Sequence, residues 1–330
     1  MDPYIDQLRD CDDPSVAYRI ALLDARRGED DGRRQLQQKV AESTNIHRLL
    51  ALRQHDGTIR TGSEYHCYRK FQGAHWTLAA LAELGYPAGD QSLMPVVDQI
   101  HGWLSSRRHL EPPSTVIIPG QEDRVRRCAS QEGLALWYLH ELGLADERVD
   151  VLVSRLLDTR WPDGGWNCDK RSSARTSSVQ ETLWPLRGLA RHLRAGNDGA
   201  AITDSVDGAA QFLLDRRLLW RRRDGNPIRP SWGRNPMLIQ WPIRLYDVLS
   251  VLVVMAEIDR IQDARCAPAL DVLAGKRLSP GGFPAEVRTA RTVDTVTSGG
   301  TFAHWGPTGR MHPNPFVSVD AAWVLRQASP

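Results

Sequence analysis

The sequence contains little lysine and carries almost no net charge. Lysine occurs only at Lys39, Lys70, Lys170 and Lys276, so arginine supplies most of the 42 basic residues. These are nearly balanced by 40 acidic residues, which leaves a formal net charge of +2. Attraction of nucleic acid by bulk charge needs a marked excess of basic residues. The balance therefore gives no reason to expect a nucleic-acid partner.

The sequence also lacks paired cysteine motifs and long apolar segments. No Cys-x-x-Cys motif occurs, and the scattered cysteines are Cys11, Cys67, Cys128, Cys168 and Cys266. This pattern argues against a disulfide framework and against a structural zinc knuckle. The longest apolar run, residues 248–256, is far shorter than the ~20 residues that a membrane span needs. The first residues are acidic and do not resemble a signal peptide. We therefore expect a soluble, cytoplasmic protein without a membrane span.

Helical periodicity is what the sequence does contain, and no segment alternates as a strand would. Apolar helices are expected over residues 72–85, 130–143, 177–190, 246–257 and 317–325. Amphipathic helices are expected between them, over residues 91–104, 148–157, 206–218 and 264–273. Such alternation favours an inner ring of buried helices inside an outer ring of half-exposed ones. Two long loops, residues 111–123 and 284–315, complete the pattern.

Glycine pairs followed by an aromatic residue mark the turns between helices. They occur as Asp163-Gly164-Gly165-Trp166 and Gly281-Gly282-Phe283, with a weaker version at residues 54–57. A recurring turn of this kind indicates a repeat of helix pairs. We predict an all-α chain that forms one α/α toroid domain over residues 1–330, with five to six helix pairs. Residues 1–70 supply irregular first helices, and residues 71–330 supply the repeated pairs.

The order of helix, Asp-Gly-Gly-Trp turn, polar loop and apolar helix resembles a known repeat. Squalene–hopene cyclases, other class II terpene cyclases and protein prenyltransferase β subunits share it. Residues 161–171, with Ser177, Ser178, Glu181 and Thr182 after them, look like bacterial single-toroid proteins of the cyclase-like or prenyltransferase-like kind. The resemblance extends from residue 48 onward in architecture and is sharpest over residues 161–190.

The resemblance implies a terpenoid-cyclase-like enzyme. Such an enzyme would fold a hydrophobic, isoprenoid substrate in a central cavity and act on it with acid–base groups at the cavity mouth. One alternative is a prenyltransferase-like enzyme that uses an isoprenyl diphosphate. Another is a non-catalytic toroid that binds a lipid or a protein. No cofactor is expected, and a metal ion is the one alternative that is considered.

In such a toroid the inner helices begin at one mouth of the cavity, so polar residues near their N-termini are the site candidates. The catalytic candidates are Asp169, Glu181, Glu132, Asp247, His75 and Asp12. The substrate-binding candidates are Asn167, Lys170, Arg171, Gln131, Gln180, Trp241, Tyr246, Trp305 and Tyr68. Helix capping is the competing interpretation, because Ser, Asp and Glu commonly satisfy the first amides of a helix.

Two motifs of the resembled families match only in part. Asp10-Cys11-Asp12-Asp13 has the form of the Asp-x-Asp-Asp acid motif of class II cyclases, which would make Asp12 the acid. The alternative is that Asp13 caps a helix with Pro14 at its first position. The zinc pattern of prenyltransferases is absent, since the equivalent positions read Ser177-Ser178-Val179. A different zinc set would combine Cys168 and Asp169 with one of His75, His304 or His312.

Overall fold

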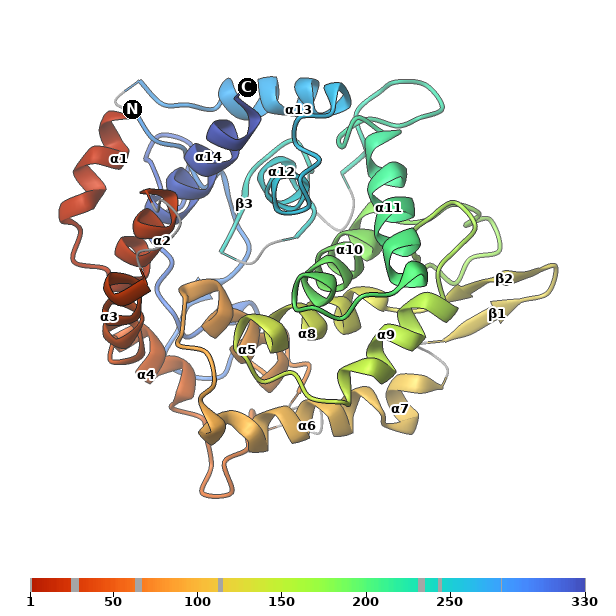
Figure 1. The fold of residues 1–330 in the computed structure, drawn as a ribbon, viewed down its shortest axis with the longest axis horizontal. Helices are drawn as coiled ribbons and strands as arrows, with labels where there is room; N and C mark the ends of the chain where they lie inside the picture. Colours follow the sequence, from red (N-terminus) through yellow and green to blue (C-terminus); the bar gives the residue numbers. More distant parts are fainter. Residues whose placement is uncertain are drawn as a thin grey trace. The chain divides into compact units, whose positions relative to one another are not determined.

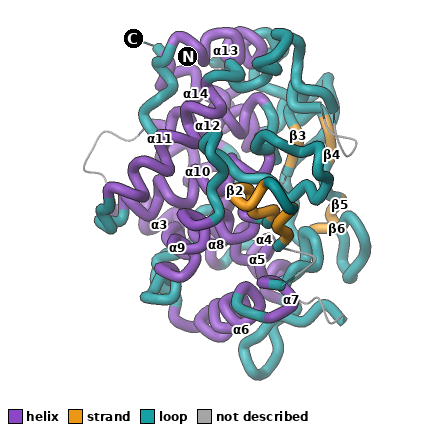
Figure 2. Tube along the Cα trace, turned by 90° about the vertical axis from the view of Figure 1, so that its right-hand side faces the viewer, coloured by secondary structure: helices purple, strands orange, loops and turns teal. Residues whose placement is uncertain are grey.

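The structure, a computed structural model, is mostly helical. It describes residues 2–24, 30–62, 67–111, 115–230, 235–242, 245–279 and 281–329. About half of the chain is helical, and the strands found in these ranges are only two to six residues long (Figure 2). Of the all-α class predicted from the sequence, the helical majority is confirmed, but short strands are also present. None of the described helices is both long and apolar enough to cross a membrane.

The chain forms two compact units. The first unit comprises Met1–Pro87 and Arg217–Pro330, and the second comprises Ala88–Arg216. Each unit is described by itself below. The toroid and the single domain over residues 1–330 concern both units together and stay predictions.

The second unit begins with a 3-10 turn, Gln91–Leu93, and then contains α6 to α11 and one hairpin. Its elements are α6 (Met94–Leu104), α7 (Arg107–Leu110), β1 (Val116–Ile118), β2 (Gln121–Arg126), α8 (Ala129–Glu141), α9 (Val149–Asp158), α10 (Val179–Arg194) and α11 (Ala200–Leu214). Helix α9 packs on α8, α11 packs on α10, and α8 and α10 pack on each other (Figure 1). The unit is therefore built around two helix pairs.

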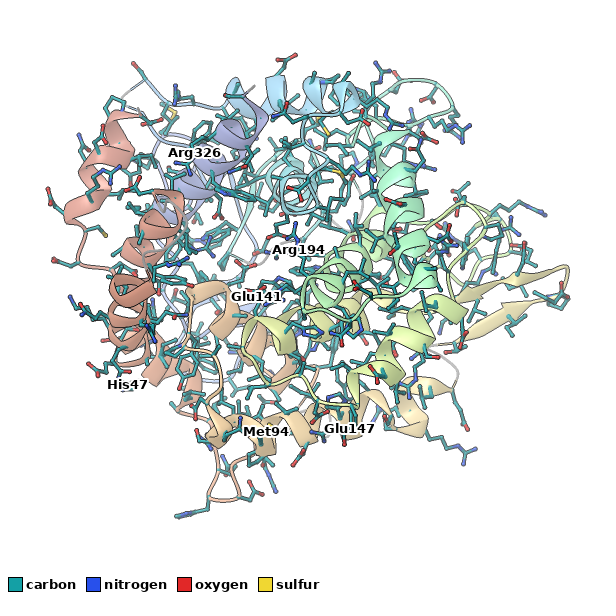
Figure 3. All side chains as sticks on the ribbon, viewed as in Figure 1. His47, Met94, Glu141, Glu147, Arg194 and Arg326 are labelled. Carbon is teal, nitrogen blue, oxygen red and sulfur yellow. The ribbon has the colours of Figure 1, made fainter. Side chains whose placement is uncertain are left out.

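Helices α8 and α10 run parallel and make close contact along their length. At their starts, the Ser130 amide donates to Glu181 Oε2 at 3.0 Å. At their ends, Arg191 Nε donates to Glu141 Oε1 at 2.5 Å; Glu141 is labelled in Figure 3. Their partners α9 and α11 are less buried; α9, for example, buries only the face formed by Val149, Leu152, Val153 and Leu156. In each pair one helix is therefore more buried than the other, although the sequence of α10 is itself amphipathic, unlike the apolar inner helix that was expected.

The turn before α10 closes on itself and then fastens to that helix. The Trp161 amide donates to the Gly165 carbonyl at 2.8 Å, and the Gly164 amide donates back to the Trp161 carbonyl at 2.9 Å. Gly164 has a φ of 97°, which glycine adopts without strain. The Trp166 amide then donates to Thr182 Oγ1, on the first turns of α10, at 3.2 Å. The Asp-Gly-Gly-Trp segment therefore fixes where α10 begins.

The first unit contains the remaining elements. They are α1 (Pro3–Gln7), α2 (Pro14–Asp24), α3 (Asp30–Ala41), α4 (Thr44–Leu50), α5 (Ala74–Leu84), β3 (Gln240–Trp241), α12 (Val248–Glu257), α13 (Ala267–Ala274), β4 (Val287–Arg288), β5 (Arg291–Thr292), β6 (Gly300–Thr301) and α14 (Pro315–Ala328), with 3-10 turns at Leu8–Asp10 and Ala264–Cys266. Helix α12 packs on α13 and α14, and α14 packs on α2.

The turn before α14 repeats the geometry of the turn before α10. The Leu278 amide donates to the Gly282 carbonyl at 3.0 Å, and the Gly281 amide donates to the Leu278 carbonyl at 2.9 Å. The Phe283 amide then donates to Ser318 Oγ at 2.8 Å. Ser318 is the fourth residue of α14, as Thr182 is the fourth residue of α10. The two turns are therefore equivalent down to the hydroxyl that receives the aromatic residue's amide.

The weaker turn of the sequence has the same closed form. The Gln54 amide donates to the Thr58 carbonyl at 2.8 Å, and the Gly57 amide donates to the Gln54 carbonyl at 2.9 Å. Ile59 follows it in place of the aromatic residue and is completely buried. A structural repeat thus links segments that share little sequence.

The two long loops contain short paired strands, although no strand was expected from the sequence. β1 and β2 pair as an antiparallel hairpin in the second unit. In the first unit, β3 pairs with β4 and β5 pairs with β6, both in parallel. Apart from β2, which has six residues, these strands have only two or three and are too short to show alternation, so the surrounding fold rather than a local pattern decides their pairing.

Candidate functional site

Three ionisable side chains meet where α8 and α10 begin. Among the described residues, Cys128, Cys168 and Glu181 form a group whose thiol sulfurs and carboxylate oxygen all lie within 4.8 Å of one another. Cys128 directly precedes α8, Cys168 lies in the loop after the Asp-Gly-Gly-Trp turn, and Glu181 lies in the first turn of α10. All three keep some solvent-accessible surface.

Backbone pairing brings the two cysteines together. The strand β2 ends at Arg126, which forms an isolated parallel bridge with Asn167. The Arg127 amide donates to the Asn167 carbonyl at 3.1 Å. Because Cys128 follows Arg127 and Cys168 follows Asn167, this bond places the two thiols side by side.

Glu181 is held by the backbone of the neighbouring helix. One carboxylate oxygen, Oε2, accepts the Ser130 amide at 3.0 Å. The other, Oε1, lies 3.5 Å from Cys168 Sγ and accepts its hydrogen bond. The start of α10 is fixed in turn by the Ser178 amide, which donates to the Trp166 carbonyl at 2.8 Å. One oxygen of Glu181 is thus committed to the fold, and the other faces the thiols.

The surroundings of this group favour its protonated forms. Burial raises the pKa of Glu181 above its ordinary value, although hydrogen bonds from Ser130 and Cys168 oppose this. The hydrogen bond with Cys128, burial and the charge of Glu181 raise the pKa of the Cys168 thiol. A carboxyl and two thiols with these properties can exchange a proton with a ligand, or can lose their protons to a thiophilic cation.

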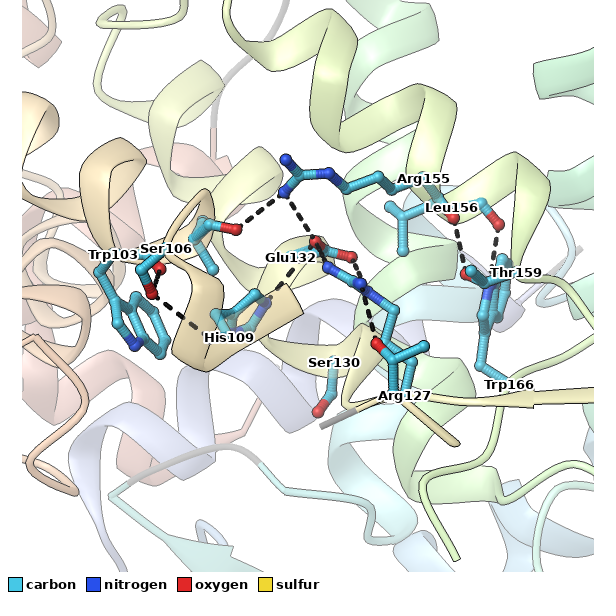
Figure 4. A network of polar contacts seen from close by, with 12 residues as sticks. Trp103, Ser106, His109, Arg127, Ser130, Glu132, Arg155, Leu156, Thr159 and Trp166 are labelled. Carbon is cyan, nitrogen blue, oxygen red and sulfur yellow. Dashed lines mark hydrogen bonds and ion pairs between the residues drawn. The ribbon is translucent and has the colours of Figure 1, made fainter. Parts of the chain in front are cut away.

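Glu132, a predicted catalytic residue, lies in a buried ionic network in the same unit (Figure 4). Its side chain is 0% exposed and forms an ion pair with Arg127, whose Nε lies 2.9 Å from Oε2. Arg155 Nη1 lies 3.4 Å and His109 Nε2 3.7 Å from Oε1. These partners account for the charge of Glu132 without a substrate.

The network keeps Glu132 ionised. Burial alone would raise the pKa of this carboxyl, but hydrogen bonds with His109 and Arg127, and the charge of Arg127, lower it below its ordinary value. A carboxylate with no accessible surface and three cationic or imidazole neighbours is suited to joining helices. It is poorly suited to contact with a bound ligand.

The loop after the Asp-Gly-Gly-Trp turn carries four predicted residues. Asn167 is buried, accepts the Asp169 amide at 2.8 Å and donates to the Thr176 carbonyl at 2.8 Å. Arg171 binds the Asp169 carboxylate, and this hydrogen bond lowers the pKa of Asp169. Lys170 and Arg171 are exposed. Asn167 therefore shapes the loop, Asp169 is an ionised partner of Arg171, and the two cations are open to solvent.

Gln131 and Gln180 lie near the starts of α8 and α10, and both are partly exposed. In the sequence, Gln131 lies three residues after Cys128, and Gln180 directly precedes Glu181. Their predicted role in binding a substrate stays a prediction.

The predicted acids of the first unit are helix caps or surface groups. Asp247 caps α12, because its Oδ1 accepts the Ser250 amide at 2.8 Å. Asp12 is exposed. Its neighbour Asp13 accepts the Ser15 amide at 2.9 Å at the start of α2, as the capping interpretation of this motif predicted. The capping interpretation therefore describes both sites.

Four of the predicted binding residues are aromatic, and they lie in the first unit. Trp241 Nε1 donates to the Trp305 carbonyl at 2.9 Å, and the two ring centroids are 5.7 Å apart. Tyr246 donates its hydroxyl to the Leu218 carbonyl at 2.5 Å. These three side chains are buried. Tyr68 is partly exposed, and its ring centroid lies 6.4 Å from that of the fully buried His75. Packing accounts for the three buried rings.

A histidine pair joins the far ends of α8 and α10. His140 Nε2 and His192 Nδ1 lie 2.9 Å apart, so one ring must donate and the other accept. Burial and the charges of His192 and Arg191 lower the pKa of His140 to about 4, and burial lowers the pKa of His192. Both rings are therefore neutral in the folded chain near neutral pH.

Acid is expected to weaken the fold through this pair. The unfolded chain binds more protons than the folded chain as the pH falls from about 6.5 towards about 4. We expect a loss of about 1–2 kcal/mol over this range, after allowance for partial solvent screening. Denaturant titrations across this range would measure it. The variant His140→Gln should flatten the profile, whereas substitution of the exposed His47 (Figure 3) should leave it unchanged. Equal slopes for all three proteins would contradict this account.

The sequence predicts only part of the Cys128–Cys168–Glu181 group. It indicates Glu181 as a site residue and combines Cys168 only with Asp169 and a histidine, and it gives Cys128 no role. The signal for Cys128 is its place just before the helix expected over residues 130–143, whereas Cys168 lies in the loop before the next expected helix. Comparisons of the chain with protein-family models, with curated proteins and with solved structures found no match.

Proposed function

We propose that this chain is an enzyme related to terpenoid cyclases and protein prenyltransferases, and that it acts on a hydrophobic, isoprenoid substrate. The reactive groups in this proposal are Cys128, Cys168 and Glu181, at the N-terminal ends of α8 and α10. Their convergence is the observation that carries the proposal, because ionisable groups gathered beside apolar helices form a typical reaction site.

The helix arrangement within each unit supports the proposed relationship. The α8–α9 and α10–α11 pairs of the second unit each combine a more buried helix with a less buried one. The turn before α10 recurs before α14 with the same hydrogen bonds. In this proposal the pairs of both units belong to one α/α toroid, whose inner helices all begin at the same mouth.

A cyclase-like reaction is the first candidate. It requires a polar group at the end of an otherwise apolar cavity, and Glu181 is the partly exposed carboxyl of the group. A prenyltransferase-like reaction is the second candidate, because the group contains two thiols and the exposed cations Lys170 and Arg171 lie in the same loop as Cys168, after Asp169. Such cations suit a diphosphate.

Product analysis tests the proposal. The purified chain would be incubated with squalene, farnesyl diphosphate or geranylgeranyl diphosphate, and the products would be identified by mass spectrometry. We expect turnover of at least one of them. Glu181→Gln should lower that turnover by about 100-fold or more, which is the contribution expected of a positioned acid–base group.

Glu147→Gln is the matched control, because Glu147 is exposed in the same unit (Figure 3). It should retain full turnover. Absence of product from all three substrates, or equal turnover by the Glu181 and Glu147 variants, would contradict the proposal. Copurification of an unreacted lipid with an inactive chain would instead support a non-catalytic, lipid-binding toroid.

A further inference from the structure

We propose that Cys128, Cys168 and Glu181 bind a divalent zinc ion. Their ligand atoms converge from three separate segments of the second unit, and all lie within 4.8 Å of one another. This inference does not rest on the isoprenoid activity proposed above, because it concerns binding of the ion alone.

The distances suit tetrahedral coordination. Zinc lies about 2.3 Å from a thiolate sulfur and about 2.0–2.2 Å from a carboxylate oxygen, so two ligands of one ion lie about 3.5–3.8 Å apart. Cys168 Sγ and Glu181 Oε1 are already 3.5 Å apart. The remaining separations between ligand atoms are at most 4.8 Å. Side-chain rotations that move these atoms by about 1 Å would therefore bring all three to the separations of a zinc site.

The chemistry of the ligands favours zinc over hard cations. Two thiolates are soft ligands, which zinc accepts, whereas magnesium and calcium prefer an all-oxygen set. The three ligands together carry three negative charges when deprotonated. The N-terminal ends of α8 and α10, helices of 13 and 16 residues, lie beside them and favour that charge. The two helix ends thus offset part of the cost of this negative charge when the ion binds.

Contacts behind the ligands already orient them. The Ser130 amide holds Glu181 Oε2 and leaves Oε1 directed at the thiols. The bond from the Arg127 amide to the Asn167 carbonyl fixes the two residues that precede the cysteines. Such supporting bonds are typical of metal centres, where they orient the ligands.

Three protein ligands would leave the fourth position of a tetrahedral ion open. Structural zinc centres usually have four protein ligands, whereas a centre with three protein ligands can also hold water or a substrate. The partial exposure of all three side chains is consistent with such access. The geometry therefore points to an ion that can contact a ligand, rather than one that only staples the fold.

Metal titration tests the inference on the intact chain. The protein would be stripped with a chelator, kept reduced, and titrated with Zn²⁺ in competition with a chromophoric chelator. We expect one ion per chain. Replacement by Co²⁺ should give the intense ultraviolet charge-transfer absorption of cobalt–thiolate bonds and the visible bands of tetrahedral cobalt.

Single variants identify the ligands. Cys128→Ser, Cys168→Ser and Glu181→Gln should each weaken Zn²⁺ binding by at least about 100-fold, and the double cysteine variant should lose the cobalt–thiolate absorption. Cys11→Ser and Glu147→Gln are the matched controls, because neither side chain belongs to the group. Both should bind Zn²⁺ as the parent chain does. Circular dichroism would verify that every variant is folded.

Failure of the parent chain to bind Zn²⁺ stoichiometrically would overturn the inference. So would tight binding or retained cobalt–thiolate absorption in the folded double cysteine variant. These outcomes do not depend on any isoprenoid assay. Zn²⁺ binding without product would therefore support the metal site and contradict the proposed function. Product formation without Zn²⁺ binding would support the proposed function and contradict the metal site.

Discussion

Replacement of Glu132 by alanine is expected to lower the free energy of unfolding by about 3–5 kcal/mol. Glu132 is completely buried and bonds to Arg127, which is only 6% exposed. Arg155 and His109 also approach its carboxylate. Removal of the carboxylate leaves the Arg127 guanidinium buried without its counter-charge, and an uncompensated buried charge is the costly outcome. Urea titrations followed by circular dichroism would measure the loss.

Glu141→Ala is the matched control, because it also removes a glutamate of α8 that pairs with an arginine. In the pair of Glu141 with Arg191, the side chains are 36% and 30% exposed. A pair with this much access to water contributes about 1 kcal/mol or less. If Glu132→Ala and Glu141→Ala lowered the stability equally, the Glu132 network would not be the ionic core of this unit.

The helices of this chain could be predicted from the sequence because their signal is local. The five expected apolar segments correspond to α5, α8, α10, α12 and α14, with ends that differ by a few residues. Gly85 ends α5 in the left-handed conformation, as expected of a glycine after a helix. Periodicity and capping act within a few residues, so one sequence reveals them.

The contacts across segments could not be predicted in this way. Glu132 lies in the first turn of its helix, where glutamates are common. Its negative charge is nevertheless balanced by Arg127, and Arg155 and His109 from other elements also approach its carboxylate. The polar residues expected at one mouth accordingly divide into caps, network members and exposed groups. Which of these a residue becomes depends on partners that are distant in the sequence.

The same limit applies to the Cys128–Cys168–Glu181 group. Its assembly depends on the backbone bond between Arg127 and Asn167, and that bond joins the end of a short strand to a loop. Neither segment has a sequence pattern that predicts this backbone bond. The Asp-Gly-Gly-Trp turn did indicate where α10 begins, and it therefore located Glu181 but not the convergence of the three side chains.

The close approach of α8 and α10 leads to the second large expected effect. A methyl group on Gly133 would lie 2.3 Å from the Pro185 nitrogen and 2.4 Å from the Trp184 carbonyl carbon. Both are backbone atoms, so α8 and α10 would have to separate. We expect Gly133→Ala to lower the free energy of unfolding by about 2–4 kcal/mol, despite the better helix propensity of alanine. Gly188→Ala should act similarly, because its methyl group would meet the Gly133 carbonyl oxygen at 2.4 Å.

Gly102→Ala distinguishes this packing effect from the general effect of a glycine in a helix. Gly102 lies in α6 with nothing within 4 Å of the position a methyl group would take. That substitution should raise the stability by about 0.5–1 kcal/mol, because alanine favours the helix. Opposite signs for Gly133→Ala and Gly102→Ala in denaturant titrations would place the constraint at the α8–α10 contact. A stabilising Gly133→Ala would mean that the two helices do not approach as closely as described, and the convergence of Cys128, Cys168 and Glu181 at their starts would lose its support.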